Sequence, residues 1–140
     1  MKSEQKDFDA LQQRLRQAPF HQWLGLELIA FGEDSVEIRA SWREEWVVNP
    51  ERRYTHGGII AALVDLAADW ALYGRLGRPA PTIDMRVDYH RAAMPGDLVA
   101  RGRVIHAGGQ FSLCEAQIFD RDGQLCASGR GTYFTAPPKT

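Results

Sequence analysis

Residues 55–76 have the sequence THGGIIAALVDLAADWALYGRL, and this stretch decides the fold. From Gly57 to Leu76 the segment is apolar on almost every side, which predicts a helix buried within the protein rather than lying on its surface. Gly74 and the residues up to Pro79 are expected to end this helix. Because such a helix needs cover on most sides, the rest of the chain should supply it.

Strand patterns fill most of the remaining chain. Before the helix, residues 26–31 and 36–40 flank a turn at 32–34, and the alternation of apolar and polar side chains predicts a hairpin with one buried face. Four more strands are expected after the helix: 82–90, 98–106, 110–119 and 124–135. The sequence therefore predicts an α+β domain in which an antiparallel β-sheet wraps around a long central helix.

The N-terminal end is predicted to be an added helix. Apolar residues recur at helical spacing over 7–18, and Pro19 stops the pattern. Residues 1–6 are polar and are expected to fray. A short aromatic turn of helix follows, which Phe20 and Trp23 should dock on the larger body.

The composition is that of one globular domain. The 140 residues are 44% hydrophobic and 25% charged, enough to build a single core. Two cysteines form neither a disulfide framework nor a zinc pattern. The net charge of −1 argues against nucleic-acid or membrane partners, and no apolar run has the length of a membrane span or signal peptide. We expect a cytoplasmic protein with a helical extension over 1–19 and one domain over 20–136.

The start of the central helix is the first candidate for chemistry. Gly57 and Gly58 keep side chains away from the free N–H groups of the first turn, so a ligand oxygen can approach them. Such donors suit the oxyanion of an acyl transfer reaction. The alternative is that the two glycines merely allow a tight entry to the helix. His56 could act as a base, as a donor to a carbonyl or as the helix N-cap, and capping is the favoured role.

The second candidate is an acid within the apolar helix. Asp65 should cost stability unless it is paired or faces a wet cleft, and partial desolvation would make it a better base. Asp69 lies one turn later on the same face. The alternative is that Asp65 is a structural acid bonded to a backbone amide or an arginine.

Other chemistries lack their signatures. No Gly-x-Ser-x-Gly, GxGxxG or phosphate-loop sequence occurs, and Cys114 and Cys126 lie in strand patterns. The basic residues after the helix could bind the phosphates of a carrier such as coenzyme A or simply form solvated strand faces; they are His90, Arg91, Arg101, Arg103 and Arg130.

These motifs together resemble the hotdog-fold acyl-CoA thioesterases of the phenylacetate-degradation (PaaI-like) type. The resemblance rests on His56-Gly57-Gly58, the six residues that follow, and Asp65. The strand at 82–89, the turn Pro95-Gly96-Asp97 and the closing Ser128-Gly129-Arg130-Gly131-Thr132 fit the same family. The similarity covers roughly residues 20–135.

The resemblance implies a mechanism and a set of site residues. The Gly57 N–H would polarise the thioester carbonyl, and Asp65 would activate water or attack the carbonyl itself. The two would come from different subunits of a homodimer. Thr82 would position the water. Its strand parity is opposite to that of Ile83 and Met85, so it reaches the helix side only if the strand end twists or bulges. Asn49 is the candidate for a further site residue, but it lies seven residues before His56 where the family has six.

The expected reaction is hydrolysis of an acyl-CoA, including aryl-acyl-CoA, to free acid and CoA. Gly58, His90, Arg91 and Arg130 are the candidates for substrate and CoA binding. No metal or separate cofactor is expected, since coenzyme A is part of the substrate. Dimer and tetramer both remain open.

Two other functions are weighed. A non-catalytic acyl-CoA-binding or regulatory domain would keep the pocket and the Gly57 amide without needing Asp65. A dehydratase or hydratase would need a different pairing of histidine and acid.

Overall fold

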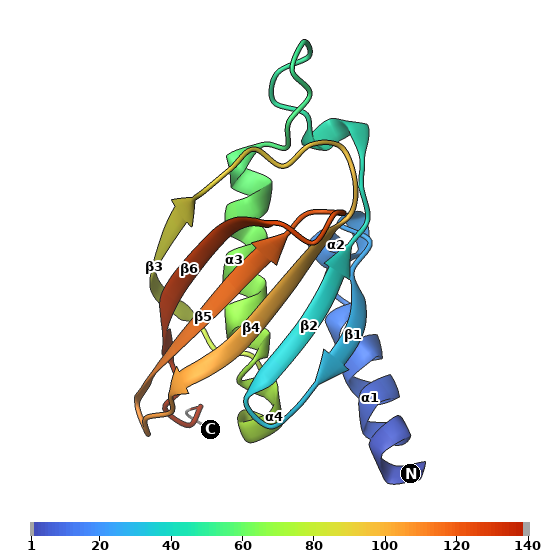
Figure 1. Cartoon of the computed structure of the whole chain (residues 1–140). Helices are drawn as coiled ribbons and strands as arrows, with labels where there is room; N and C mark the ends of the chain where they lie inside the picture. Colours follow the sequence, from blue (N-terminus) through green and yellow to red (C-terminus); the bar gives the residue numbers. More distant parts are fainter. Residues whose placement is uncertain (1, 139–140) are drawn as a thin grey trace.

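The computed structural model describes residues 2–138, which form a six-stranded antiparallel sheet curved around one long helix (Figure 1). The helices are α1 (Lys2–Leu15), α2 (Pro19–Trp23), α3 (Gly57–Trp70) and α4 (Tyr73–Leu76), with a 3-10 turn η1 (Glu44–Trp46). The strands are β1 (Glu27–Phe31), β2 (Ser35–Ala40), β3 (Thr82–Tyr89), β4 (Leu98–His106), β5 (Phe111–Phe119) and β6 (Leu125–Phe134). Their order in the sheet is β1-β2-β4-β5-β6-β3. This confirms the predicted hotdog architecture.

Two glycines allow α3 to lie directly against the sheet. A Cβ at Gly102 of β4 would stand 2.0 Å from the Ala67 carbonyl oxygen, and one at Gly129 of β6 would stand 2.5 Å from a methyl group of Val64. Any larger residue would push the helix away from the strands. Leu63, Val64 and Ala67 are fully buried at this contact, which forms the centre of the hydrophobic core.

The central helix is shorter than predicted. It ends at Trp70, and the chain turns into α4 rather than continuing unbroken to Leu76. The change of direction brings Gly74 so close to the β1–β2 turn that a Cβ there would lie 2.6 Å from the Gly32 and Glu33 carbonyl oxygens. An ion pair between Arg75 and Asp34 holds α4 on the same turn.

The N-terminal helix also differs from the expectation. It begins at Lys2, so residues 2–6 are helical rather than frayed, and it ends at Leu15. Ala18 precedes a proline and adopts an extended conformation, which separates α1 from α2. Phe20 does not dock on the body: its side chain is 48% exposed and stacks on Trp23, at 6.2 Å between ring centroids.

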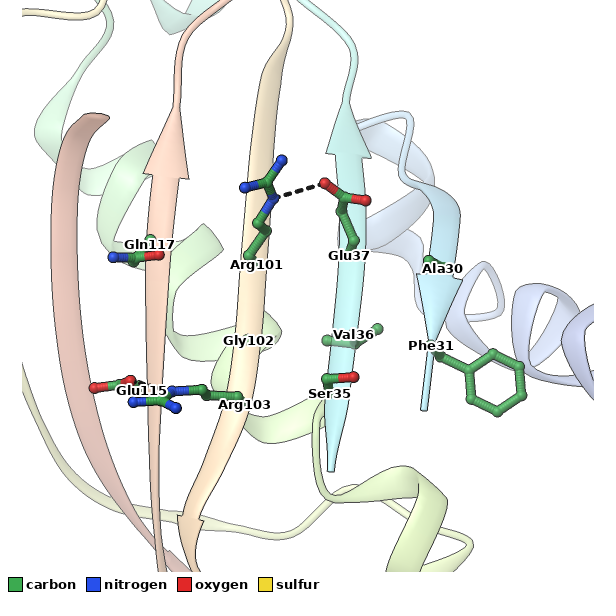
Figure 2. Close-up of a pocket in the computed structure, with 10 residues that line it drawn as sticks. All are labelled: Ala30, Phe31, Ser35, Val36, Glu37, Arg101, Gly102, Arg103, Glu115 and Gln117. Carbon is green, nitrogen blue, oxygen red and sulfur yellow. Dashed lines mark hydrogen bonds and ion pairs between the residues drawn. The ribbon is translucent and has the colours of Figure 1, made fainter. Parts of the chain in front are cut away.

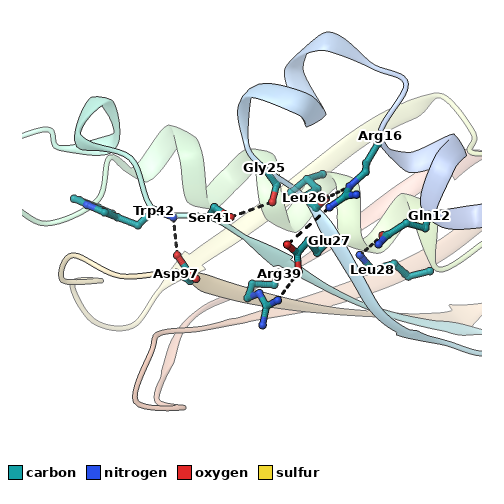
Figure 3. Close-up of polar contacts among 10 residues, drawn as sticks. All are labelled: Gln12, Arg16, Gly25, Leu26, Glu27, Leu28, Arg39, Ser41, Trp42 and Asp97. Atoms are coloured by element: carbon teal, nitrogen blue, oxygen red, sulfur yellow. Dashed lines mark hydrogen bonds and ion pairs between the residues drawn. The ribbon is translucent and has the colours of Figure 1, made fainter. Parts of the chain in front are cut away.

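Helix α1 is tied to the edge of the sheet at β1 (Figure 3). The Leu28 N–H donates to the side-chain oxygen of Gln12 at 2.6 Å, and the Arg16 guanidinium donates to the Leu26 carbonyl at 2.9 Å. Leu11 and Leu15 are buried in the main core. The helical extension therefore shares the core of the domain.

Strand β3 forms the opposite edge (Figure 1). It pairs with β6 on one side, and no strand within residues 2–138 pairs with its other side. Its apolar side chains Ile83 and Tyr89 are 55% and 54% exposed. No helix in the described part of the chain has the length and apolar character needed to cross a membrane.

Candidate active site

The N-terminus of α3 is capped as the sequence predicts. The Gly58 N–H donates to Nδ1 of His56 at 2.8 Å, so His56 is the N-cap. Within residues 2–138 the Gly57 N–H has no acceptor, because it belongs to the first turn of the helix. It is therefore free to donate to a ligand, and the helix dipole favours a negatively charged one.

Tyr89 of β3 covers this helix end. Its hydroxyl donates to the Gly57 carbonyl oxygen at 2.7 Å, and a Cβ at Gly57 would stand 3.3 Å from the tyrosine ring. The absence of a side chain at Gly57 therefore lets the tyrosine close over the first turn. Tyr89 is not among the site residues predicted from the sequence.

A cavity of about 340 Å³ opens at the same helix end. Gly57, Tyr89, His90 and Arg91 are among the residues that line it. His90 and Arg91, predicted to bind the substrate, thus lie beside the Gly57 amide. The His90 Nε2 atom is 2.8 Å from the Ser128 hydroxyl, which orients the imidazole.

Asp65 lies two turns further along α3, and two hydroxyl groups donate hydrogen bonds to its carboxylate. The Thr82 hydroxyl donates to the Oδ1 atom at 2.8 Å, and the Tyr133 hydroxyl reaches the same atom and the Asp65 carbonyl oxygen at 3.1 Å each. Asp65 is only partly exposed. A carboxylate with two donors on one oxygen keeps its second oxygen for a water molecule or a carbonyl carbon.

Thr82 reaches the helix because β3 is irregular at its start. The pairing of β3 with β6 shifts register between Thr82 and Asp84, which is the bulge that the strand parity required. A twist or a bulge of the strand end was the condition for Thr82 to reach the helix side, and the register shift is such an irregularity.

Tyr133 was missed in the sequence analysis. It lies on β6 at the same parity as Gly129 and Gly131, which face the helix, and a Cβ at Gly131 would stand 2.7 Å from its hydroxyl. Glycine at 131 thus makes room for the ring. Burial and the neighbouring Asp65 carboxylate raise the pKa of Tyr133, so its hydroxyl stays protonated and can donate. The alternation along β6 could have placed it on the helix side.

Asp69 is the second acid of the helix face. The Ala80 N–H donates to its Oδ1 atom at 2.7 Å. The pKa of Asp69 is raised to about 7, mainly by burial; the Ala80 hydrogen bond opposes this increase and the nearby Asp65 charge adds to it. One alternative for Asp65 was a structural acid bonded to a backbone amide. The structure has this arrangement at Asp69 instead.

Two predicted residues lie apart from these groups within one protomer. The Asn49 side-chain oxygen accepts from the Glu51 and Arg52 N–H groups at 2.9 and 3.1 Å, which shapes the 49–52 turn. Arg130 lies on the sheet face opposite α3, 3.9 Å from Glu115. Their roles in a substrate site stay predictions.

A larger cavity of about 430 Å³ lies on that outer face (Figure 2). Arg101 pairs with Glu37 at 2.8 Å there, and Arg103 pairs with Glu115. Figure 2 shows these side chains directed toward one another across neighbouring strands. Each of these arginines is therefore paired with an acid on the strand surface. This agrees with the alternative that Arg101 and Arg103 belong to solvated strand faces.

Thiol and metal chemistry have little support at these positions. Burial raises the pKa of Cys114 to about 12, so its thiol stays protonated. Among residues 2–138, no group of three histidine, cysteine or acidic side chains is arranged to hold a metal ion.

The family of the chain follows from comparison with known proteins. A family model described as the thioesterase superfamily matches residues 53–127, which include Gly57, Asp65 and Thr82. The chain belongs to the thioesterase superfamily. The predicted enzyme class, a thioesterase, is confirmed at this level.

Individual relatives agree with this family. A medium/long-chain acyl-CoA thioesterase from Salmonella typhimurium, YigI, is 28% identical over 132 residues, which cover 83% of this chain and 84% of the relative. The proofreading thioesterase EntH of Cronobacter turicensis is 28% identical over 109 residues, covering 76% and 78%.

Solved structures share the fold. One structure of a protein from the thioesterase superfamily is 46% identical, with a TM-score of 0.88 and coverage of 91% of this chain and 96% of that one. Zebra fish thioesterase superfamily member 2 is 25% identical, with a TM-score of 0.81 and coverage of 92% and 98%.

Proposed function

We propose that this thioesterase hydrolyses an acyl-CoA thioester at a site built between the two subunits of a homodimer. Asp65 acts as general base or nucleophile, and the Gly57 N–H polarises the thioester carbonyl. The observation that carries the proposal is the Asp65 carboxylate, which stands on a helix that is apolar apart from Asp65 and Asp69, with the Thr82 and Tyr133 hydroxyls holding one of its oxygens.

The distance between the two halves of the site supports a dimer. Gly57 and Asp65 are eight residues apart on one helix, which corresponds to about 12 Å along its axis at 1.5 Å per residue. A carbonyl bound to the Gly57 amide is therefore out of reach of Asp65 in the same protomer. A second copy related by a twofold axis supplies the missing half to each site.

The free edge of β3 is the surface on which we place this dimer. Strand β3 joins the two halves, because Thr82 at its start contacts Asp65 and Tyr89 at its end contacts Gly57. An antiparallel pairing of β3 with its copy brings the start of one strand beside the end of the other. This arrangement also covers the exposed Ile83 and Tyr89 and removes an open sheet edge.

The cavity beside Gly57 is the proposed entry for coenzyme A. Arg91 and His90 line it and can contact phosphate groups, while the carbonyl approaches the helix end. Arg130 of the outer face and Asn49 of the 49–52 turn remain candidates for contacts with a partner's substrate.

The reaction then proceeds through a tetrahedral intermediate. As general base, Asp65 takes a proton from water while the water oxygen bonds to the thioester carbon and the carbonyl oxygen becomes an oxyanion on the Gly57 N–H. The C–S bond breaks, and the proton passes to the departing CoA thiolate. As nucleophile, Asp65 would displace the thiolate to form an anhydride, which water cleaves in a second step.

Asp65→Asn provides the direct test of this function. We expect the wild type to release CoA from at least one member of a panel of short-chain, long-chain and aryl acyl-CoAs, detected with a thiol reagent. Asp65→Asn should lower kcat by at least about 100-fold, because an amide can neither accept the proton nor attack. Asp122→Asn, in the exposed β5–β6 turn, is the matched control and should leave kcat unchanged. Tight binding of acyl-CoA without thiol release would instead favour a binding domain.

A further inference from the structure

The segment between α4 and β3 is held against the central helix at a single backbone donor. It contains Pro79-Ala80-Pro81, and because proline has no N–H, Ala80 carries the one amide hydrogen of these three residues. That N–H donates to Oδ1 of Asp69 at 2.7 Å. Ala80 is only 4% exposed, so the donor of this bond is buried.

Two acids one turn apart on α3 therefore hold alternate residues of the same segment. Asp69 accepts from the Ala80 backbone, and Asp65 accepts from the Thr82 side chain two residues later. The prolines restrict the backbone on both sides of Ala80, so a displacement there is transmitted to Thr82.

The other side of the segment is bound to the sheet rather than to the helix. The Phe134 N–H donates to the Pro81 carbonyl at 2.8 Å, and the Arg78 guanidinium donates to the Thr135 carbonyl at 3.3 Å. These bonds fix the segment along β6. The bond to Asp69 ties it to the helix that carries Asp65.

We propose that Asp69 is a positioning residue for hydrolysis: it holds the Ala80 amide against α3 and thereby places the Thr82 hydroxyl on Asp65. This inference rests on the proposed function, because it assigns Asp69 a role at the same site. Asp69 does not touch the substrate. Its effect on the reaction passes through Thr82.

Two substitutions separate the hydrogen bond from the charge. Asp69→Asn keeps an oxygen that accepts from the Ala80 N–H, so kcat should stay within about threefold of the wild type. Asp69→Ala removes the acceptor, and kcat should fall about tenfold with KM little changed. Rescue by asparagine would show that the contact, and not the negative charge, is required.

A double-mutant cycle with Thr82→Ala tests the route through Thr82. If Asp69 acts by placing the Thr82 hydroxyl, the double variant should have the same kcat as Thr82→Ala alone. A double variant whose kcat falls by the product of the two single effects would overturn the proposal, and so would an Asp69→Ala enzyme with wild-type kcat. Melting temperature and oligomeric state are measured for every variant. If Asp69→Ala does not fold, Asp69→Ser takes its place, because the serine side chain is shorter than that of aspartate.

Amide hydrogen exchange separates this proposal from the proposed function. Exchange at Ala80 should be faster in Asp69→Ala than in the wild type and unchanged in Asp69→Asn. Unchanged exchange in Asp69→Ala would contradict the anchoring. If the wild type cleaves no thioester, the proposed function fails and the positioning role of Asp69 in hydrolysis fails with it, whatever the exchange rates. If the wild type is active and Asp69→Ala is equally active, the function stands and this inference alone is wrong.

Discussion

The Thr82 hydroxyl donates a hydrogen bond to the Asp65 carboxylate at 2.8 Å, across a bulge where β3 leaves regular pairing with β6. Without the bulge the hydroxyl would lie on the opposite face of the sheet, since side chains alternate along a strand. The irregularity therefore couples the edge strand to the acid of the central helix.

Replacing the Thr82 hydroxyl should slow the reaction without harming the fold. Thr82→Val has nearly the same shape but leaves Asp65 without this donor, and we expect kcat to fall about tenfold. Thr82→Ser keeps the hydroxyl and should stay within about threefold of the wild type. Thr132→Val, on the face of β6 turned away from α3, is the matched control. Equal activity of Thr82→Val and the wild type in the thiol-release assay would contradict this role.

The raised pKa of Asp69 predicts a pH dependence of stability. Asp69 has its pKa at about 7 in the folded chain, mainly because burial disfavours the charge, against a usual value of 3.8. Between these values the folded state binds a proton that the unfolded state has lost. The free energy of unfolding should therefore fall as pH rises from about 4 to about 7, and this loss should be complete above pH 7.

Asp69→Asn removes that titration. The variant should gain stability relative to the wild type at pH 8, and the gain should be smaller at pH 4.5, where the wild-type carboxyl is largely neutral in the folded state. Urea denaturation at the two pH values measures the difference. A gain at pH 4.5 as large as that at pH 8 would show that the charge on Asp69 does not cost stability.

The free edge of β3 should be required for the dimer. Ile83→Asp places a charge on an exposed apolar position of β3, and we expect it to convert the dimer to a monomer, as measured by sedimentation velocity. The matched control is Ile29→Asp on β1, the strand at the other edge of the sheet, where Ile29 is 40% exposed. If Ile29→Asp dissociates the dimer and Ile83→Asp does not, the interface lies at the β1 edge and its placement on β3 is wrong.

Much of the fold could be predicted from local pattern. Alternation of apolar and polar residues, together with the turns between segments, predicted all six strands, and the apolar run after His56 predicted the central helix with its capped start. These features depend on neighbours in the sequence, so one chain is enough to recognise them.

The features that were missed depend on contacts between distant segments. The helix ends at Trp70, and α4 then packs on the β1–β2 turn, where Gly74 approaches the Glu33 backbone. Tyr133 reaches Asp65 because glycine at 131 leaves space for its ring. Periodicity assigns such residues to a face of an element but does not tell which residue of another element they contact.

The central claim is that each site takes its Gly57 N–H from one subunit and its Asp65 carboxylate from the other. Gly57→Pro removes the N–H at the first helical position, where proline is compatible with a helix. Gly57→Ala keeps the N–H and serves as its control for the added bulk near Tyr89. We expect Gly57→Pro and Asp65→Asn to be almost inactive when each is assayed alone.

Mixing these two inactive variants is the most direct measurement. After subunit exchange, about half of the dimers should be mixed, and each mixed dimer has one intact site and one site with both changes. If Gly57 and Asp65 act across the interface, thiol release should return to about a quarter of the wild-type rate, since half of the dimers then have one working site of two. If the mixture stays as inactive as its components after subunit exchange has been demonstrated, Gly57 and Asp65 do not act across the interface and the shared site does not exist.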